Sequence, residues 1–373
     1  MDWREWFLAR FGPGFLGGIV FGDWWRLLSE RRFAIPPSRL PRALAITLQS
    51  LQNSFLGRRE RRRHGPDLER TVVEPPLFIL GHWRSGTTHL HNLLTVDRRF
   101  AFPNNYQACF PHTFLGTEAR SARRIGWFIP RRRPMDNVAW DMTSPQEDEF
   151  ALATLTQKSP CLSWVFPAHR ERYERYLTFR GAADGEADEW LGALELFLRK
   201  LTWKYRRPLI LKSPPHTCRI RLLLRKFPQA KFVHVHRDPF TVFQSSRWTF
   251  LVNFRWQGLE RPRLDDLDDW VIRQYREMYD VFFEERKLIP PGRYHEVAFE
   301  DLERDPLGAV RATYEALGLP DFGSVEADLV RYVASLSGYR KNAFPDLAPD
   351  LRGRIFREWR ASFEEWGYPS PGP

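Results

Sequence analysis

The chain has 373 residues and a formal net charge of +11. This length allows one large α/β domain with insertions or two smaller domains, and we expect one. Arginine dominates the basic residues and suits phosphate and sulfate groups, but the excess alone identifies no ligand. The cysteines, Cys109, Cys161 and Cys218, are too widely separated for a disulfide framework or a zinc motif, so we expect a reducing compartment and no bound metal.

The N-terminus is rich in aromatic side chains, including Trp3, Trp6, Trp24 and Trp25. Charged residues interrupt it, so its apolar run is far shorter than the roughly 20 residues needed to cross a bilayer, and no signal-type cleavage site follows. Three roles stay open: packing against the main domain, packing against a second subunit in a homo-oligomer, and lying on a membrane surface. We expect a cytoplasmic protein, with peripheral membrane association in the last case.

Residues 44–56 have the spacing of an amphipathic helix. The arginine-rich run at 58–66 predicts a polar connector, because charge runs are usually solvated. We therefore expect residues 1–70 to form an aromatic-rich helical extension with a basic connector, ahead of the main domain at 71–373.

Apolar runs of strand length precede helical patterns in the main domain, at residues 77–80, 208–212, 231–236 and 294–299. Strands that alternate with helices predict an α/β fold with a central parallel sheet flanked by helices. Ligands in such sheets bind beyond the carboxyl ends of the strands. The polar residues that follow these strands, in the loop after Leu80, at Lys212 and at Arg237, are therefore expected to meet in one crevice.

The first strand leads into a loop with the glycine spacing of a phosphate-binding loop. In a nucleotide-hydrolysing loop a lysine follows the second glycine, but Thr87 stands there and Arg84 is the cation. Glycines allow the backbone to wrap around an anion, and the helix that begins at Gly86 directs free N–H groups toward it. We expect an anion site that is poorly suited to a magnesium triphosphate, formed by Gly81, His82, Trp83, Arg84, Ser85, Gly86, Thr87 and Thr88.

Three blocks together resemble the bacterial sulfotransferases that use 3′-phosphoadenosine-5′-phosphosulfate (PAPS), over most of residues 75–368. They are this loop, the sequence Lys-Ser-Pro-Pro-His at 212–216, and the sequence Val-His-Val-His-Arg-Asp-Pro at 233–239 followed by Ser245. The resemblance implies a single P-loop-like sulfotransferase domain at 71–373. It also implies an enzyme that transfers a sulfuryl group from PAPS to a hydroxyl, or less favourably an amine, of a small molecule, lipid or glycan.

The resemblance also implies roles for individual residues. Arg84 and the loop amides hold the 5′-phosphate and the leaving oxygen, and Lys212 contacts the transferred sulfuryl group or the bridging oxygen. The spacing of Arg237 and Ser245 matches the pair that holds the 3′-phosphate in this superfamily. A weaker match at 338–342 supplies Arg340 and Lys341 as a closing element over the same phosphate.

The catalytic base is specified less clearly, because Pro214 stands where cytosolic sulfotransferases have a histidine. Other branches use a glutamate after the phosphate loop. Residues 100–204, which we assign to the acceptor side as an insertion, contain one dense carboxylate cluster at 145–150. Glu147 is the predicted base. A helix-opening acidic turn without a catalytic role is the competing interpretation, and the other candidate bases are Glu149, Asp148, His112 and His216.

Two other classes of function are weighed against this one. A P-loop kinase or other nucleotide phosphotransferase would use the loop, but Thr87 replaces its lysine and no strand end offers an obvious Walker-type aspartate. A nucleic-acid-binding protein would use the positive charge. Acidic segments such as 265–269 interrupt the basic ones, so we expect no nucleic-acid partner. The identity of the acceptor and the oligomeric state are not specified by the sequence.

Overall fold

The computed structural model describes residues 3–133, 135–136, 138–338 and 341–370. The chain divides into two compact units built from interleaved segments. The first unit comprises Met1–Glu74, Ala101–Leu209 and Phe250–Arg263. The second comprises Pro75–Phe100, Ile210–Thr249 and Leu264–Pro373.

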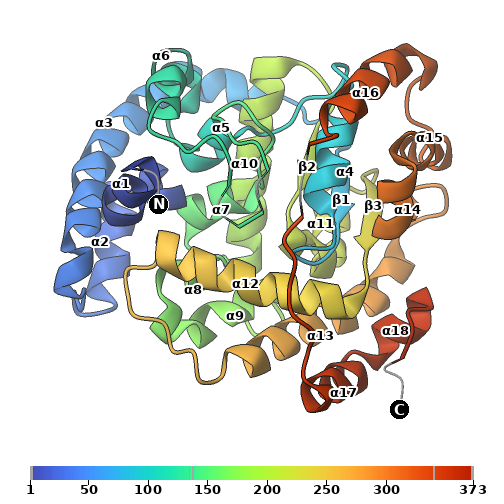
Figure 1. The fold of residues 1–373 in the computed structure, drawn as a ribbon. Helices are drawn as coiled ribbons and strands as arrows, with labels where there is room; N and C mark the ends of the chain where they lie inside the picture. Colours follow the sequence, from blue (N-terminus) through green and yellow to red (C-terminus); the bar gives the residue numbers. More distant parts are fainter. Residues whose placement is uncertain (1–2, 134, 137, 339–340, 371–373) are drawn as a thin grey trace. The chain divides into compact units, whose positions relative to one another are not determined.

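The second unit contains a four-stranded parallel sheet in the order β2-β1-β3-β4 (Figure 1). Its inner strands β1 and β3 are buried on both faces apart from the first residue of β3, as expected for parallel strands covered by helices. The sheet confirms the predicted α/β class, and each strand lies within its predicted range. The bounds are β1 (Leu77–Leu80), β2 (Ile210–Lys212), β3 (Lys231–His236) and β4 (Tyr294–Ala298).

Helices follow each strand and pack on the sheet. One core cluster joins Ile79 and Val233 of the sheet to Leu90, Val310 and Leu329 of three helices. Burying such side chains stabilises the fold by about 1.5–3 kcal/mol each. The helices are α4 (Thr87–Leu94), α11 (Ile220–Lys226), α12 (Pro239–Gln257), α13 (Leu267–Glu285), α14 (Phe299–Arg304), α15 (Pro306–Ala316), α16 (Gly323–Ser335), α17 (Pro349–Glu358) and α18 (Arg360–Trp366), with short 3-10 turns at Pro214–Cys218 and Arg286–Leu288.

The first unit is built from helices. Figure 1 shows α1 and α2 lying along the long helix α3. The elements are α1 (Trp3–Phe11), α2 (Phe21–Ser29), α3 (Leu40–Arg70), α5 (Asn105–Cys109), α6 (Phe114–Gly126), α7 (Glu149–Thr156), α8 (Leu162–Val165), α9 (Glu171–Thr178) and α10 (Glu186–Tyr205), with 3-10 turns at Gly14–Gly18, Pro37–Arg39 and Pro167–His169.

The aromatic N-terminus is partly core and partly surface. Phe15 and Trp24 are buried, and the indole N–H of Trp24 donates to the Thr47 hydroxyl of α3 at 2.8 Å. Trp3 and Trp25, in contrast, are about half exposed, at 50% and 51%. The segment therefore packs within its own unit but leaves apolar surface uncovered. No helix in the described ranges is both long enough and apolar enough to span a bilayer.

Helix α3 is longer than the sequence pattern predicts. The basic run at 58–66, expected as a connector, continues the helix through Pro66 to Arg70. Arginine is a good helix former, and the inner face of this part is anchored by buried contacts. The Glu60 carboxylate lies 2.5 Å from the Lys200 ammonium of α10 and accepts the Gly116 backbone N–H at 2.9 Å. The expectation of a non-helical connector was therefore wrong, although the arginines are exposed as expected.

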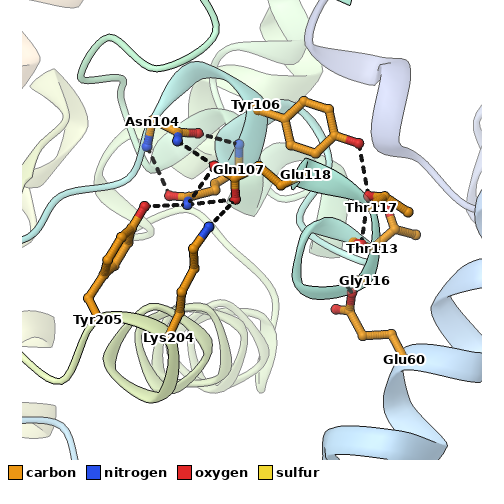
Figure 2. Close-up of polar contacts among 10 residues, drawn as sticks. All are labelled: Glu60, Asn104, Tyr106, Gln107, Thr113, Gly116, Thr117, Glu118, Lys204 and Tyr205. Atoms are coloured by element: carbon orange, nitrogen blue, oxygen red, sulfur yellow. Dashed lines mark hydrogen bonds and ion pairs between the residues drawn. The ribbon is translucent and has the colours of Figure 1, made fainter. Parts of the chain in front are cut away.

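A polar network fixes the start of α5, within the predicted acceptor-side residues 100–204 (Figure 2). Asn104 and Gln107 form a capping box, in which each side chain bonds to the backbone of the other residue. The Gln107 amide also donates to the Tyr205 hydroxyl at 2.6 Å. The Glu118 carboxylate accepts from both amides and pairs with Lys204. Helices α5, α6 and α10 are thus held together by hydrogen bonds to one carboxylate.

Candidate active site

The register of the sheet brings the predicted site segments of the second unit to one edge. Ile79 of β1 lies opposite Lys212, the last residue of β2. On the other side of β1, Leu80 lies opposite His234 of β3. Since all strands are parallel, the loop after Leu80, Lys212 and Arg237 emerge from the same edge. These segments therefore leave the sheet at one edge, as expected, and their meeting in one crevice stays a prediction.

Gly81 allows the loop to fold tightly over the strand ends. Its φ is +139°, and a Cβ there would lie 2.5 Å from the Val235 carbonyl oxygen. Its N–H donates to the Thr217 hydroxyl at 2.7 Å, and the N–H of His82 donates to the Tyr279 hydroxyl at 3.3 Å. These two hydrogen bonds therefore fix the loop to the 3-10 turn after β2 and to α13. Thr217 and Tyr279 are not among the site residues predicted from the sequence, although Thr217 directly follows the block at 212–216.

The N-terminus of α4 faces the other end of the loop. Gly86 has φ +102° and precedes the helix, whose first intrahelical N–H donor is His89. The N–H groups of Gly86, Thr87 and Thr88 precede this donor, so they remain for an anion at the positive end of the helix dipole. Ser85 and Thr87 are buried. The loop thus has the backbone geometry of an anion site.

His82 and Trp83 act in this loop through their backbone. Both side chains are buried, and the imidazole Nδ1 of His82 lies 2.8 Å from the Trp83 carbonyl oxygen. Burial lowers the pKa of His82 to about 4, so the ring is neutral near pH 7. The Ser246 hydroxyl of α12 donates to the same carbonyl at 3.3 Å.

Arg84 joins the loop to α12. Its backbone adopts φ +74°, and its guanidinium Nε donates to the hydroxyl of Ser245 at 2.9 Å. Ser245 is buried in the second turn of α12, so this hydrogen bond holds the arginine beside the residue predicted to bind the 3′-phosphate. The predicted loop cation and the predicted 3′-phosphate residue are therefore neighbours.

Arg237 stacks on an aromatic ring beside this pair. Its guanidinium carbon lies 4.2 Å from the ring centroid of Phe299, and its Nη1 donates to the Arg84 carbonyl at 3.3 Å. Among the described residues, no carboxylate lies within ion-pair distance of it. Instead, the neighbouring Asp238 caps α12 by accepting the Thr241 N–H at 2.8 Å. Asp238 thus bonds to the first turn of α12 and not to Arg237.

The charge on Arg237 is destabilised in the absence of a ligand. Burial is the main cause that lowers its pKa, and the positive charge of Arg84 adds to the effect. Two cations that repel one another in a half-buried place favour binding of an anion between or beside them. This is the electrostatic signature expected of a phosphate or sulfate site.

Phe299 contacts both the loop and the cations, although it is not among the site residues predicted from the sequence. A Cβ on Gly86 would lie 2.2 Å from the Phe299 ring carbon Cδ2, so the ring is packed against the loop glycine. The ammonium of Lys341 lies 5.8 Å from the centroid of the same ring. Lys341 also pairs with Glu303 at 2.5 Å and is about half exposed. Arg340, predicted to act with Lys341, lies outside the described residues.

Lys212 and His216, from the second of the three blocks, are both buried. Lys212 ends β2 and is 2% exposed, so it is a buried lysine and not a surface one. His216 lies in the 3-10 turn that follows and is also buried. Its ring stands edge-on against Phe78 at 5.3 Å between centroids, an arrangement typical of a packed core histidine.

The acidic turn at 147–149 belongs to the first unit. Asp148 directly precedes α7, which begins at Glu149. Glu147 is 9% exposed, and Asp148 and Glu149 are fully buried. Gln146 fixes the turn, because its backbone N–H donates to the Pro103 carbonyl at 2.9 Å and its side chain accepts the Glu147 N–H at 2.9 Å. The turn does open a helix, as the competing interpretation expects, but its three carboxylates are buried, and burying a charged group is costly unless it is paired.

His112, another candidate base, is poorly suited to that role. It is largely buried, and burial together with the charges of Lys200 and Arg61 lowers its pKa to about 3. A general base works best with a pKa near the working pH. His112 would be neutral but only weakly basic.

The fold places a glycine-containing loop, the N-terminus of α4 and the cations Arg84 and Arg237 together at the carboxyl edge of a parallel sheet. A family model described as the sulfotransferase family matches residues 75–323. The chain belongs to this family and is an enzyme of the sulfotransferase class. The P-loop kinase interpretation is not favoured.

Individual relatives agree with this assignment. The chain is 38% identical over 367 residues to the omega-hydroxy-beta-dihydromenaquinone-9 sulfotransferase Stf3 of Mycobacterium tuberculosis, covering 98% of this chain and 93% of the relative. The protein of the same name from Mycobacterium bovis matches equally.

Solved structures show the same fold. The sulfotransferase STF9 from Mycobacterium avium matches with a TM-score of 0.66 and 21% identity, covering 92% of this chain and 97% of that one. The sulfotransferase STF1 from M. tuberculosis matches with a TM-score of 0.64 and 16% identity, covering 91% and 92%. Within the described residues, no group of three or more His, Cys, Asp or Glu side chains is arranged to hold a metal ion.

Proposed function

We propose that the enzyme transfers the sulfuryl group of PAPS to a hydroxyl of a lipid-like acceptor. The observation that carries the choice of donor is the cluster of Arg84, Ser245 and Arg237 beside the N-terminus of α4. It offers positive charge and hydrogen-bond donors for two separate phosphates, as a 3′,5′-bisphosphorylated nucleotide requires. In this proposal residues 71–373 form the sulfotransferase domain and residues 100–204 supply the acceptor side.

The donor is held by complementary contacts. The N–H groups of Gly86, Thr87 and Thr88 receive the 5′-phosphate at the positive end of α4. Arg237 and Ser245 bind the 3′-phosphate, with Lys341 as an additional charge and Arg340 assigned to the same role from the sequence. Burial, and after it the charge of Arg84, lower the pKa of Arg237, and a dianionic 3′-phosphate bound beside both cations offsets these two effects.

The transfer itself forms one bond and breaks one bond. The acceptor oxygen forms a bond to sulfur, and the bond between sulfur and the oxygen bridging to the 5′-phosphate breaks with both electrons leaving on that oxygen. Lys212, buried at the end of β2, and Arg84 stabilise the growing negative charge. In this proposal the two cations stabilise the developing negative charge, which is the role of magnesium in nucleotide hydrolases.

The proton of the acceptor hydroxyl goes to a carboxylate. Glu147 is the proposed base, because it is the least buried of the three carboxylates in the turn and the Gln146 side chain holds its backbone in place. Glu149 is the nearest alternative within the same turn, and Asp148 the next. His112 is disfavoured by its low pKa, and His216 by its packing against Phe78.

The acceptor is proposed from the name of Stf3, the relative whose alignment covers 98% of this chain. The name of Stf3 describes a hydroxylated dihydromenaquinone as the molecule it acts on. Identity of 38% over 98% of this chain supports a hydroxylated isoprenoid quinone, or a lipid of similar shape, as acceptor here. A glycan or a small phenol is a less favoured acceptor.

The experiment is a mass-spectrometric assay of the purified full chain with PAPS and hydroxylated menaquinone, in EDTA. We expect a product heavier than the acceptor by one SO3 group, and no product with ATP and magnesium in place of PAPS. Sulfation of phenols or sugars but not of the quinone would refute the proposed acceptor and retain the donor. Turnover that EDTA abolishes and only magnesium restores would refute the proposed donor site.

A further inference from the structure

Helix α3 exposes an apolar face that nothing in the described structure covers. Its large side chains on this face are between 49% and 68% exposed. Their spacing of three and four residues places them in one line along the helix. We call this set the α3 stripe; it consists of Leu40, Leu44, Leu48, Leu51 and Phe55.

The opposite face of α3 already forms the core of the first unit. Ala43, Ile46, Ser50 and Asn53 are buried there, and the Asn53 amide donates to the Gly17 carbonyl at 2.7 Å. The helix is therefore apolar on two faces. Packing within the unit accounts for only one of them, and a contiguous apolar surface on a folded protein marks an interaction site.

The line of the stripe continues into positive charge. Arg58 and Arg62 follow Phe55 at the same three- and four-residue spacing, and Arg59, Arg61 and Arg63 extend the charge around the helix. All five arginines are exposed. From Leu40 to Arg63 the only carboxylate is that of Glu60, which is buried against Lys200. This face thus combines apolar side chains with unopposed positive charge.

Aromatic side chains border the stripe. Helix α2 packs on α3 beside the stripe, because the Phe21 N–H donates to the Ser54 hydroxyl at 2.8 Å, one residue before Phe55. In α2 the Trp25 ring is 51% exposed and contacts the Phe33 ring at 4.9 Å between centroids. Exposed tryptophan beside leucine and arginine is typical of the interface between lipid headgroups and acyl chains.

We propose that the α3 stripe and its arginines are a docking surface for an anionic lipid bilayer. The apolar side chains enter the boundary between headgroups and acyl chains, and the arginines bind the phosphates. A second copy of the chain fits this face less well. In a parallel pairing Arg58 and Arg62 would face one another, and in an antiparallel pairing they would face Leu40 and Leu44, with no carboxylate to balance them in either case.

The test is co-sedimentation of the full chain with vesicles of phosphatidylglycerol and phosphatidylcholine, without donor or acceptor. This readout is independent of the proposed function. We expect the wild type to bind these vesicles. Its affinity for vesicles of phosphatidylcholine alone should be at least about tenfold lower. Leu48→Glu with Phe55→Glu should lower binding by at least about 100-fold, because two apolar side chains are lost from the interface. Arg58→Glu with Arg62→Glu should lower it by at least roughly 30-fold.

Matched controls separate this surface from general effects of charge and folding. Leu196→Glu with Val330→Glu introduces the same two charges at apolar residues that are 45% and 46% exposed elsewhere. Arg304→Glu with Arg331→Glu repeats the charge reversal at exposed arginines of α14 and α16. Both control variants should bind the anionic vesicles with an affinity within about threefold of that of the wild type, once the effect of their lower net charge is subtracted.

Several outcomes would overturn the proposal. One is failure of the folded wild type to bind anionic vesicles at low salt. Another is binding by the stripe variants that equals that of their controls. A wild-type dimer that becomes a monomer in Leu48→Glu with Phe55→Glu, while vesicle binding persists, would assign the stripe to contact between copies of the chain instead.

Discussion

The guanidinium Nε of Arg84 donates to the hydroxyl of Ser245 at 2.9 Å, across 161 residues of sequence. The contact links the loop after β1 to helix α12. The Arg84 carbonyl meanwhile accepts from Arg237 at 3.3 Å. One loop residue is thus bonded through its side chain and its backbone to both residues assigned to the 3′-phosphate. Substitution of any of the three is expected to affect donor binding, so the separate roles need assays that resolve binding from chemistry.

Lys212→Ala and Arg84→Ala are each expected to lower kcat by roughly 10²–10³, the usual effect of removing one group that stabilises a developing oxyanion. Steady-state rates with saturating PAPS measure the effect. Lys287→Ala, at an exposed lysine that follows α13, is the control and should leave kcat unchanged. A fall of less than about threefold for Lys212→Ala would remove that residue from the site.

Glu147→Gln keeps the shape of the side chain and removes its basicity. We expect a loss of about 10²–10⁴ in rate with the affinity for PAPS nearly unchanged. Rate measurements paired with calorimetric titration of PAPS check both parts. If Glu149→Gln is inactive and Glu147→Gln is normal, the role of base belongs to Glu149.

Gly86→Ala should damage the site through the backbone. A φ of +102° is unfavourable for alanine, and the added Cβ would lie 2.2 Å from Cδ2 of Phe299. We expect a destabilisation of about 1–3 kcal/mol in urea unfolding and weaker PAPS binding. The control is Gly192→Ala in α10, where a Cβ meets no atom within 4 Å. It should stabilise the protein by up to about 1 kcal/mol. Equal stability of Gly86→Ala and wild type would contradict the described loop geometry.

Acid should destabilise the fold through its buried histidines. The folded-state pKa of His82 is lowered from 6.5 to about 4 by burial, so between these values the unfolded chain binds the proton more readily. Stability therefore falls as the pH drops from 6.5 toward 4, by up to about 3 kcal/mol for this residue. Urea midpoints measured across that window should fall less steeply for His82→Asn. Identical slopes for variant and wild type would show that His82 is not the group that titrates.

The sequence predicted the sheet well because its strands are short, continuous apolar runs at places where a turn or helix signal follows. The position of the loop after β1, Lys212 and Arg237 at one edge of the sheet could also be predicted, since the carboxyl ends of parallel strands lie at the same edge. Phe299 could not be recognised, because its role depends on a contact with Gly86 that only the folded chain creates. Helix α3 was predicted too short, since the buried pairing of Glu60 with Lys200 that supports its later turns is not visible in a local charge pattern.

Calorimetric titration of PAPS and of adenosine 5′-phosphosulfate into wild type and Arg237→Ala tests the central claim most directly. Deleting one partner of an ionised group costs about 1.5–3 kcal/mol, so the variant should bind PAPS roughly 10- to 150-fold more weakly. It should bind adenosine 5′-phosphosulfate almost as wild type does, because that nucleotide has no 3′-phosphate. Arg304→Ala, at an exposed arginine paired with Asp301, is the control. Equal losses for both nucleotides would contradict the assignment of Arg237 to the 3′-phosphate.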